Sequence, residues 1–174
     1  ISKYLSGWDD PLTIIVAKGT YSLTGSYQID KADFVICGGF DGEEEMGSVE
    51  LYDDTRAFDE NETIISGADY NAASVPFTIT GDAAASRCIY GFTFRDFTIT
   101  ESSTPIILYS DLNESPVITN LKFNNNSCAD YLLKVEMSDS AYFNNVFIAN
   151  SKFIYNSVTG ADTKRSVVSV TSGM

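Results

Sequence analysis

Short apolar runs separated by polar turns recur along the second half of the chain. Residues 94–99, 118–123 and 143–148 each read apolar, polar, Asp or Asn, apolar, any residue, apolar. The spacing is 24 residues (94 to 118) and then 25 residues (118 to 143). The last two apolar positions lie two apart and therefore point to one side of a strand. Asp or Asn at the third position suits a bend before that strand.

The segments between these units repeat as well. Residues 106–109 and 131–135 are short apolar runs about 25 residues apart, and no hairpin turn signal separates the runs. A coil of about two dozen residues that stacks on its neighbours would bury the inward side chains and pair the strands in parallel. We therefore expect an all-β solenoid in which Phe94 stacks on Ile118 and Ile118 on Phe143. A β-sandwich is the alternative.

Asparagine is dense at the predicted turns. Stacked amides at equivalent turns of successive coils would form a hydrogen-bonded ladder, and the alternative is a row of sugar-binding amides. The ladder is the preferred interpretation because asparagine follows the turn positions. The residues concerned are Asn120, Asn124, Asn125, Asn126, Asn144, Asn145, Asn150 and Asn156.

Composition and charge limit the partners. The chain has 174 residues, of which 44% are hydrophobic, and this is enough for one domain spanning residues 1–174 with a sizeable core. The formal net charge is −13 with only 11 basic residues, which argues against nucleic acid and against an anionic membrane surface. Neutral glycans, extracellular proteins and cations remain, although the charge also serves solubility alone.

The chain contains no histidine, which excludes serine triads and histidine-based metal sites. The three cysteines, Cys37, Cys88 and Cys128, show no CxxC spacing. We expect them to be small buried residues without an intramolecular disulfide.

The first half contains three segments that each read as a strand leading into a glycine-containing turn, "IIVAKGTY", "FVICGGFDGEEE" and "NETIISG". In this order they resemble pectin-lyase-like right-handed parallel β-helix proteins, in particular secreted and surface proteins of Bacteroidetes. The later FxxN motifs at residues 123–126, 147–150 and 153–156 are similar to those of polymorphic outer-membrane proteins. The resemblance implies a right-handed β-helix, a short helix over residues 1–8 that caps the first coil, and a secreted or cell-surface location in bacteria. It does not decide function, because this fold also hosts lyases and hydrolases.

The resemblance also suggests a metal site. Pectate lyases of this fold hold calcium with Asp and Glu, and the turn beside Gly42 offers Asp41, Glu43 and Glu44. A solvated acidic turn is the alternative. Arg95 and Asp96 are expected to form a local ion pair, with Asp96 as a turn residue. No residue is identified as catalytic or as binding an organic cofactor.

The sequence thus predicts a non-enzymatic secreted or surface module for glycan or protein binding, adhesion or structural spacing. The alternative is a fragment of a polysaccharide lyase or glycoside hydrolase that acts on acidic polysaccharide. The expected partners are an extracellular glycan or a surface protein, without membrane insertion in this segment. The chain starts at Ile1 without a signal peptide and stops without a polar cap. We therefore expect a piece of a longer protein whose ends can pack against other molecules.

Overall fold

The computed structural model describes residues 12–30, 34–43, 58–80, 89–112, 116–138, 146–159 and 166–172. These residues contain β-strands and turns but no helix, so the expected all-β class is confirmed for them. The helix predicted over residues 1–8 lies outside the described residues. None of the described segments forms a helix that could cross a membrane.

The strands follow one another in five similar passes of the chain. The first pass holds β1 (Leu12–Ala17), β2 (Gly19–Ser22) and β3 (Tyr27–Ile29), and the second holds β4 (Phe34–Phe40), β5 (Thr63–Ser66) and β6 (Phe77–Thr80). The third holds β7 (Ile89–Tyr90), β8 (Phe92–Arg95), β9 (Thr98–Ile99) and β10 (Ile107–Leu112). The fourth holds β11 (Val117–Thr119), β12 (Lys122–Asn124), β13 (Ser127–Cys128) and β14 (Leu133–Met137). The fifth holds β15 (Phe147–Ala149), β16 (Lys152–Ile154), β17 (Ser157–Val158) and β18 (Val168–Ser172).

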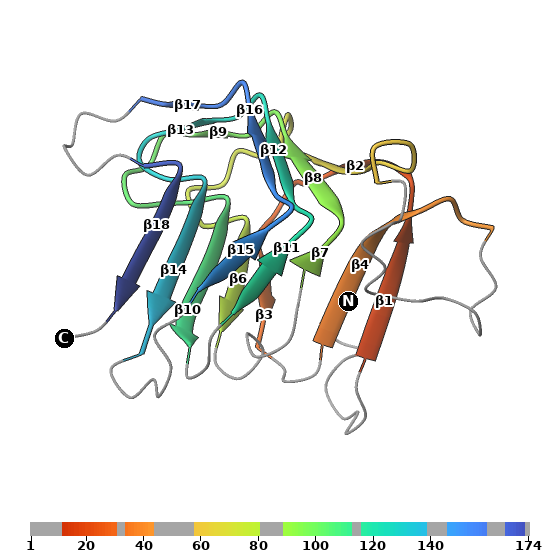
Figure 1. Ribbon diagram of the computed structural model, residues 1–174. Helices are drawn as coiled ribbons and strands as arrows, with labels where there is room; N and C mark the ends of the chain where they lie inside the picture. Colours follow the sequence, from red (N-terminus) through yellow and green to blue (C-terminus); the bar gives the residue numbers. More distant parts are fainter. Residues whose placement is uncertain are drawn as a thin grey trace.

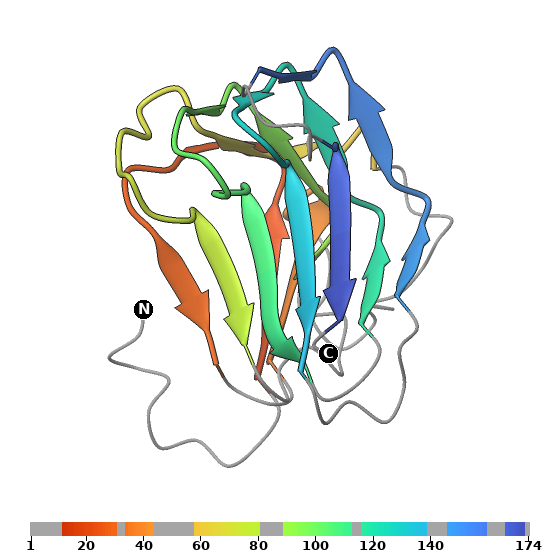
Figure 2. The same ribbon diagram turned by 90° about the vertical axis from the view of Figure 1, so that its left-hand side faces the viewer.

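Each strand pairs with its counterparts in the neighbouring passes. Two five-stranded sheets have the orders β2-β5-β8-β12-β16 and β3-β6-β10-β14-β18, and the smaller sheets are β1-β4-β7, β9-β13-β17 and β11-β15 (Figure 1). Figure 2 faces the second five-stranded sheet, whose strands run side by side from orange to blue. The pairs described here are parallel, for example β8 with β12 and β12 with β16.

The predicted repeat register is wrong. Phe94 lies opposite Phe123 rather than Ile118, and Phe123 lies opposite Phe153. The step between passes at this position is therefore 29 residues and then 30. The hydrogen-bonded pairs Phe97–Asn126 and Asn126–Asn156 show the same two steps. Ile118 lies opposite Ile148 in the sheet of β11 and β15. Phe143, the third member of the predicted stack, lies outside the described residues.

The error has a structural cause, because each pass turns two corners with the same local pattern. An apolar residue, a polar residue and an Asp or Asn follow one another at two places in the repeat. They occur where β11 leads into β12, as Ile118-Thr119-Asn120, and where β8 leads into β9, as Phe94-Arg95-Asp96. Asn120 occupies the first corner with φ 54° and Asp96 the second with φ 63°. The sequence pattern therefore matched one kind of corner with the other. By contrast, the predicted match between residues 106–109 and 131–135 is confirmed, since Ile107 pairs with Leu133.

The core lies between the sheets and is built from stacked inward side chains. Phe94 stacks on Phe123 with ring centroids 5.4 Å apart, and Phe123 stacks on Phe153 at 5.1 Å. Aliphatic residues of the other large sheet, such as Ile79, Ile107 and Val135, are fully buried in the same cluster. Cys37 and Cys128 are also fully buried, which confirms their expected role as small core residues.

Candidate functional site

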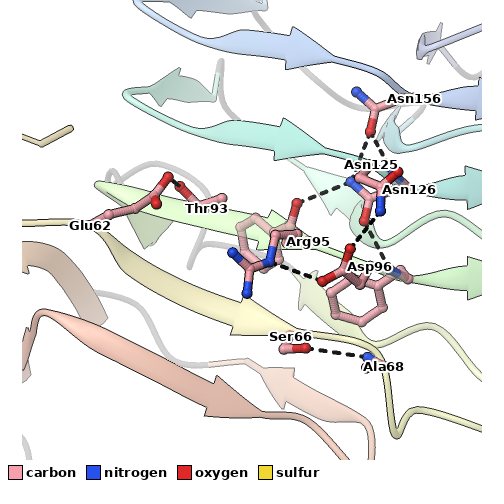
Figure 3. A network of polar contacts seen from close by, with 11 residues as sticks. Glu62, Ser66, Ala68, Thr93, Arg95, Asp96, Asn125, Asn126 and Asn156 are labelled. Atoms are coloured by element: carbon pink, nitrogen blue, oxygen red, sulfur yellow. Dashed lines mark hydrogen bonds and ion pairs between the residues drawn. The ribbon is translucent and has the colours of Figure 1, made fainter.

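Asn126 and Asn156 form an amide ladder at equivalent corners of the fourth and fifth passes, between β12 and β13 and between β16 and β17 (Figure 3). Asn126 accepts a bond from the Phe97 N–H and donates through Nδ2 to the Phe94 carbonyl, both at 3.0 Å. Asn156 repeats this one pass later, accepting from the Asn126 N–H at 3.0 Å and donating to the Phe123 carbonyl at 2.9 Å. These two amides are therefore structural, and the ladder interpretation is confirmed for them.

Arg95, Asp96 and Asn125 form a polar cluster beside this ladder, in which Arg95 and Asp96 are half-buried and Asn125 is exposed (Figure 3). Arg95 Nε lies 2.9 Å from Asp96 Oδ2, so the expected ion pair is present. Asn125 Nδ2 donates to Asp96 Oδ1 at 2.7 Å. Asp96 has φ 63°, which confirms its role as a turn residue, but its neighbour in the next pass is Asn125 and not Asn120.

The acidic turn after β4 is only partly described. Asp41 and Glu43 are exposed, and the Glu43 N–H donates to Asp41 Oδ1 at 2.8 Å, which closes a local turn. Glu44, the third predicted calcium ligand, lies outside the described residues. Within the described part of the chain, no cluster of three metal-ligating side chains occurs. Calcium binding at Asp41, Glu43 and Glu44 stays a prediction.

Cys128 is not a reactive thiol. Burial raises the pKa of Cys128 to about 12, against a backbone hydrogen bond at Ile99 that acts to lower it. A thiol with so high a pKa is protonated at neutral pH and is a poor nucleophile. Cys88 lies outside the described residues, so the absence of a disulfide stays a prediction.

A groove that the sequence did not predict lies over the sheet of β8, β12 and β16. Its volume is about 520 Å³, and the turn at residues 58–62 forms one wall. We call it the lysine groove, defined by Asp59, Glu62, Thr93, Lys122 and Lys152. The amide residues Asn120 and Asn150 also line it.

Parallel pairing aligns three of these residues. Lys122 is the register partner of Thr93 on one side and of Lys152 on the other. Register partners on adjacent strands present their side chains to the same face of the sheet, so these three form a row. Two lysines directly opposite each other repel, and this arrangement therefore requires nearby negative charge.

The turn at residues 58–62 supplies that charge. Lys122 Nζ lies 2.7 Å from Glu62 Oε1 and 3.8 Å from Asp59 Oδ1, and Lys152 Nζ lies 2.8 Å from Asp59 Oδ2. The Thr93 hydroxyl donates to the same Glu62 oxygen at 2.8 Å, as Figure 3 shows. The two carboxylates thereby tie three strands, β8, β12 and β16, to one turn.

Phe58 and Gly91 hold this turn against the sheet. The Phe58 ring meets Tyr90 edge to face with centroids 5.4 Å apart. Gly91 has φ 75°, and a Cβ added there would lie 2.6 Å from the Phe58 ring and 2.7 Å from the Gly38 carbonyl oxygen. Only glycine therefore allows the wall of the groove to approach this closely.

Both groove carboxyls are held in the charged form. Burial acts to raise the pKa of Glu62, but hydrogen bonds from Lys122 and Thr93 and the positive charges of Lys122 and Arg95 outweigh it, and the pKa is lowered. The hydrogen bond from Lys152 is the main cause that lowers the pKa of Asp59; burial acts to raise it, and the charges of Lys152 and Lys122 add to the lowering. Neither carboxyl has the raised pKa of a general acid.

The groove can therefore accept and donate hydrogen bonds, but its two carboxyls are not poised to donate protons. Ionised carboxylates accept hydrogen bonds from hydroxyl groups, while ammonium and amide groups donate hydrogen bonds to hydroxyl oxygens.

The sequence contains a faint signal of this groove, because the dipeptides Lys122-Phe123 and Lys152-Phe153 recur one pass apart and each is followed by an asparagine of the amide ladder. Comparison of the chain with family models, curated proteins and solved structures finds no match.

Proposed function

We propose that the chain is a right-handed parallel β-helix and acts as a secreted or cell-surface module that binds a glycan in the lysine groove. The fold proposal is supported by five passes of parallel, in-register strands and by the amide ladder at one corner. Stacked amides and aromatic rings at equivalent positions are expected when each pass repeats the one before it. The bacterial, extracellular location rests on the resemblance of the three strand-and-turn segments in the first half.

The observation that carries the binding proposal is the row of Thr93, Lys122 and Lys152 beside Asp59 and Glu62. Sugar hydroxyl groups both donate and accept hydrogen bonds, and this row offers fixed partners of both kinds in a shallow groove. Ion pairing holds the side chains in place before a ligand arrives, which reduces the entropy lost on binding.

The charge balance of the groove favours a neutral glycan. Each ammonium group is paired with a carboxylate, and Glu60 adds a further acidic residue to the lining. An acidic polysaccharide would meet this carboxylate set and a chain with net charge −13. The alternative function, cleavage of acidic polysaccharide, is therefore the less favoured one.

The proposal is tested by isothermal titration calorimetry with neutral oligosaccharides chosen from a glycan array. The variant Lys152→Ala removes an exposed groove donor, and we expect it to weaken binding about tenfold, as for loss of one charged hydrogen bond. Lys134→Ala is the matched control, because Lys134 is also ion-paired, to Glu136 at 2.6 Å, but lies on β14 in the other large sheet. Equal loss in both variants, or no binding to any neutral glycan, would refute the proposal.

A further inference from the structure

The exposed large apolar side chains lie at the two ends of the molecule. Among the described residues, these side chains belong either to the first pass or to the fifth, while the second, third and fourth passes have none. The first pass exposes Tyr21 and Tyr27, and the fifth exposes Phe147, Phe153, Tyr155, Val167 and Val170. Apolar surface gathered in this way marks a site of association.

Among the described residues, inner side chains of the fifth pass are more exposed than their counterparts in the fourth. The Phe153 ring lies parallel to Phe123, with an interplanar angle of 1°, but 36% of the residue is exposed. Val170 is 51% exposed, whereas Val135, its partner in the previous pass, is fully buried. β16, β17 and β18 each stand last in their sheets, so one edge of each has no neighbouring strand among the described residues.

The first pass presents the matching surface. β2 and β3 stand at the opposite ends of the same two large sheets. Tyr21 pairs in register with Ile65, which pairs with Phe94, so Tyr21 occupies the same level as Phe153 in the aromatic stack. Tyr27 pairs with Phe77 and stacks on its ring at 5.9 Å. Exposed aromatic residues therefore stand at equivalent inner positions at both ends.

We propose that a second copy of the chain binds head to tail, with the fifth pass of one molecule against the first pass of the next. β2 and β3 of the second copy would continue the sheets of β16 and β18 as parallel strands, and Tyr21 would cover Phe153. This contact repeats the geometry by which each pass packs on the next inside the molecule. Two fifth-pass ends that met about a two-fold axis would instead pair their strands antiparallel, which no described sheet does.

A head-to-tail contact is heterologous and does not close on itself, so it produces open chains whose length depends on concentration. Sedimentation velocity of the 174-residue protein is expected to show an average mass that at least doubles as the concentration rises. A protein that stays monomeric at every concentration would overturn the proposal.

Two charge variants test the polarity of the contact. Phe153→Lys blocks the fifth-pass end and Tyr21→Lys blocks the first-pass end, so each alone is expected to be monomeric. Mixed in equal amounts, they retain one complementary pair of ends and are expected to form a dimer and nothing larger. Formation of that dimer also shows that both variants fold.

Other outcomes of these experiments contradict the proposal. Association of Tyr21→Lys alone would show that two fifth-pass ends meet, and a mixture that stays monomeric would exclude the contact. Tyr155→Asn is the control for non-specific adhesion, because it removes an exposed aromatic from the fifth pass at an outer corner, where Asn125 stands one pass earlier. This variant is expected to associate like the unaltered protein, and loss of its association would also contradict the proposal.

Discussion

Asn126 is only 2% exposed, and its amide is satisfied by backbone groups of the third pass and by the Asn156 amide of the fifth. Each ladder position needs a donor and an acceptor on one short side chain, and the asparagine amide provides them on two separate atoms. A buried polar group of this kind stabilises the structure only while every bond is formed, because an unpaired one keeps its desolvation cost.

Replacing Asn126 by Asp tests the ladder at the residue scale. The new carboxylate would face the Phe94 carbonyl and Asn156 Oδ1, both of which are acceptors. We expect the free energy of unfolding to fall by about 2–4 kcal/mol in urea denaturation. Asn150→Asp, at an exposed corner with φ 49°, is the control and should change it by less than about 0.5 kcal/mol. Similar values for the two variants would contradict a structural role.

Glu62 gives a second prediction at this scale, which concerns pH. A pKa lowered in the folded state means that the Glu62 carboxylate stabilises the protein above its unfolded pKa, near 4.5. That contribution is lost as the pH falls below this value and through the folded pKa. Glu62→Gln should therefore cost about 1 kcal/mol near pH 7 and progressively less in acid, measured by urea unfolding at several pH values. A cost that does not depend on pH would contradict the ion pair.

At the scale of the element, residues with left-handed backbone recur at equivalent corners of successive passes. Asn120 and Asn150 turn one corner, and Asp96, Asn125 and Tyr155 turn the other, each with φ between 49° and 63°. Asn and Asp tolerate this left-handed backbone, but a bulky side chain does not, so Tyr155 is the strained member of the second corner.

Tyr155→Asn should therefore raise the stability by about 1 kcal/mol, as the left-handed backbone penalty suggests, and raise the melting temperature by a few degrees. The reverse change, Asn125→Tyr, should destabilise the protein, since it adds the strain and removes the bond to Asp96. Thermal unfolding followed by circular dichroism compares the two variants. If Tyr155→Asn melts earlier than the unaltered protein, the strain argument fails.

At the scale of the whole molecule, the proposal of a binding module is supported by the ionisation of the two groove carboxyls. Glycoside hydrolysis needs one carboxyl that is protonated near neutral pH and a second that is ionised. In the lysine groove, Asp59 and Glu62 both have lowered pKa values, and histidine is absent from the chain. Both carboxyls are therefore ionised at neutral pH, and neither supplies the protonated group that this reaction needs.

We accordingly expect the chain to show no lyase or glycosidase activity. Lyase cleavage of polygalacturonate would be measured near neutral pH with calcium, through the absorbance of the unsaturated product. Hydrolysis would be measured without calcium, through the release of reducing sugar. Turnover that disappears in Asp41→Asn or Glu43→Gln would move the site to the acidic turn after β4. Turnover lost in Glu62→Gln would place catalysis in the lysine groove.

The sequence alone determined the class of the fold and several local roles. Apolar residues two apart indicated strands, and residues 106–109 and 131–135 were correctly matched because their apolar runs have no competing copy within a pass. The role of Asp96 as a turn residue and the burial of Cys37 and Cys128 also followed from residue chemistry. These properties depend on a few neighbouring side chains, and a local pattern is sufficient to predict them.

Register and site were decided only by the tertiary structure. Two corners per pass carry the same apolar, polar, Asn pattern, and the choice between them depends on which alignment stacks Phe94 on Phe123 and closes the amide ladder. The lysine groove likewise joins Glu62, Thr93, Lys122 and Lys152, which lie about one pass apart in the chain and meet only through parallel pairing. No local pattern encodes such a meeting, because the packing of the passes brings these side chains together.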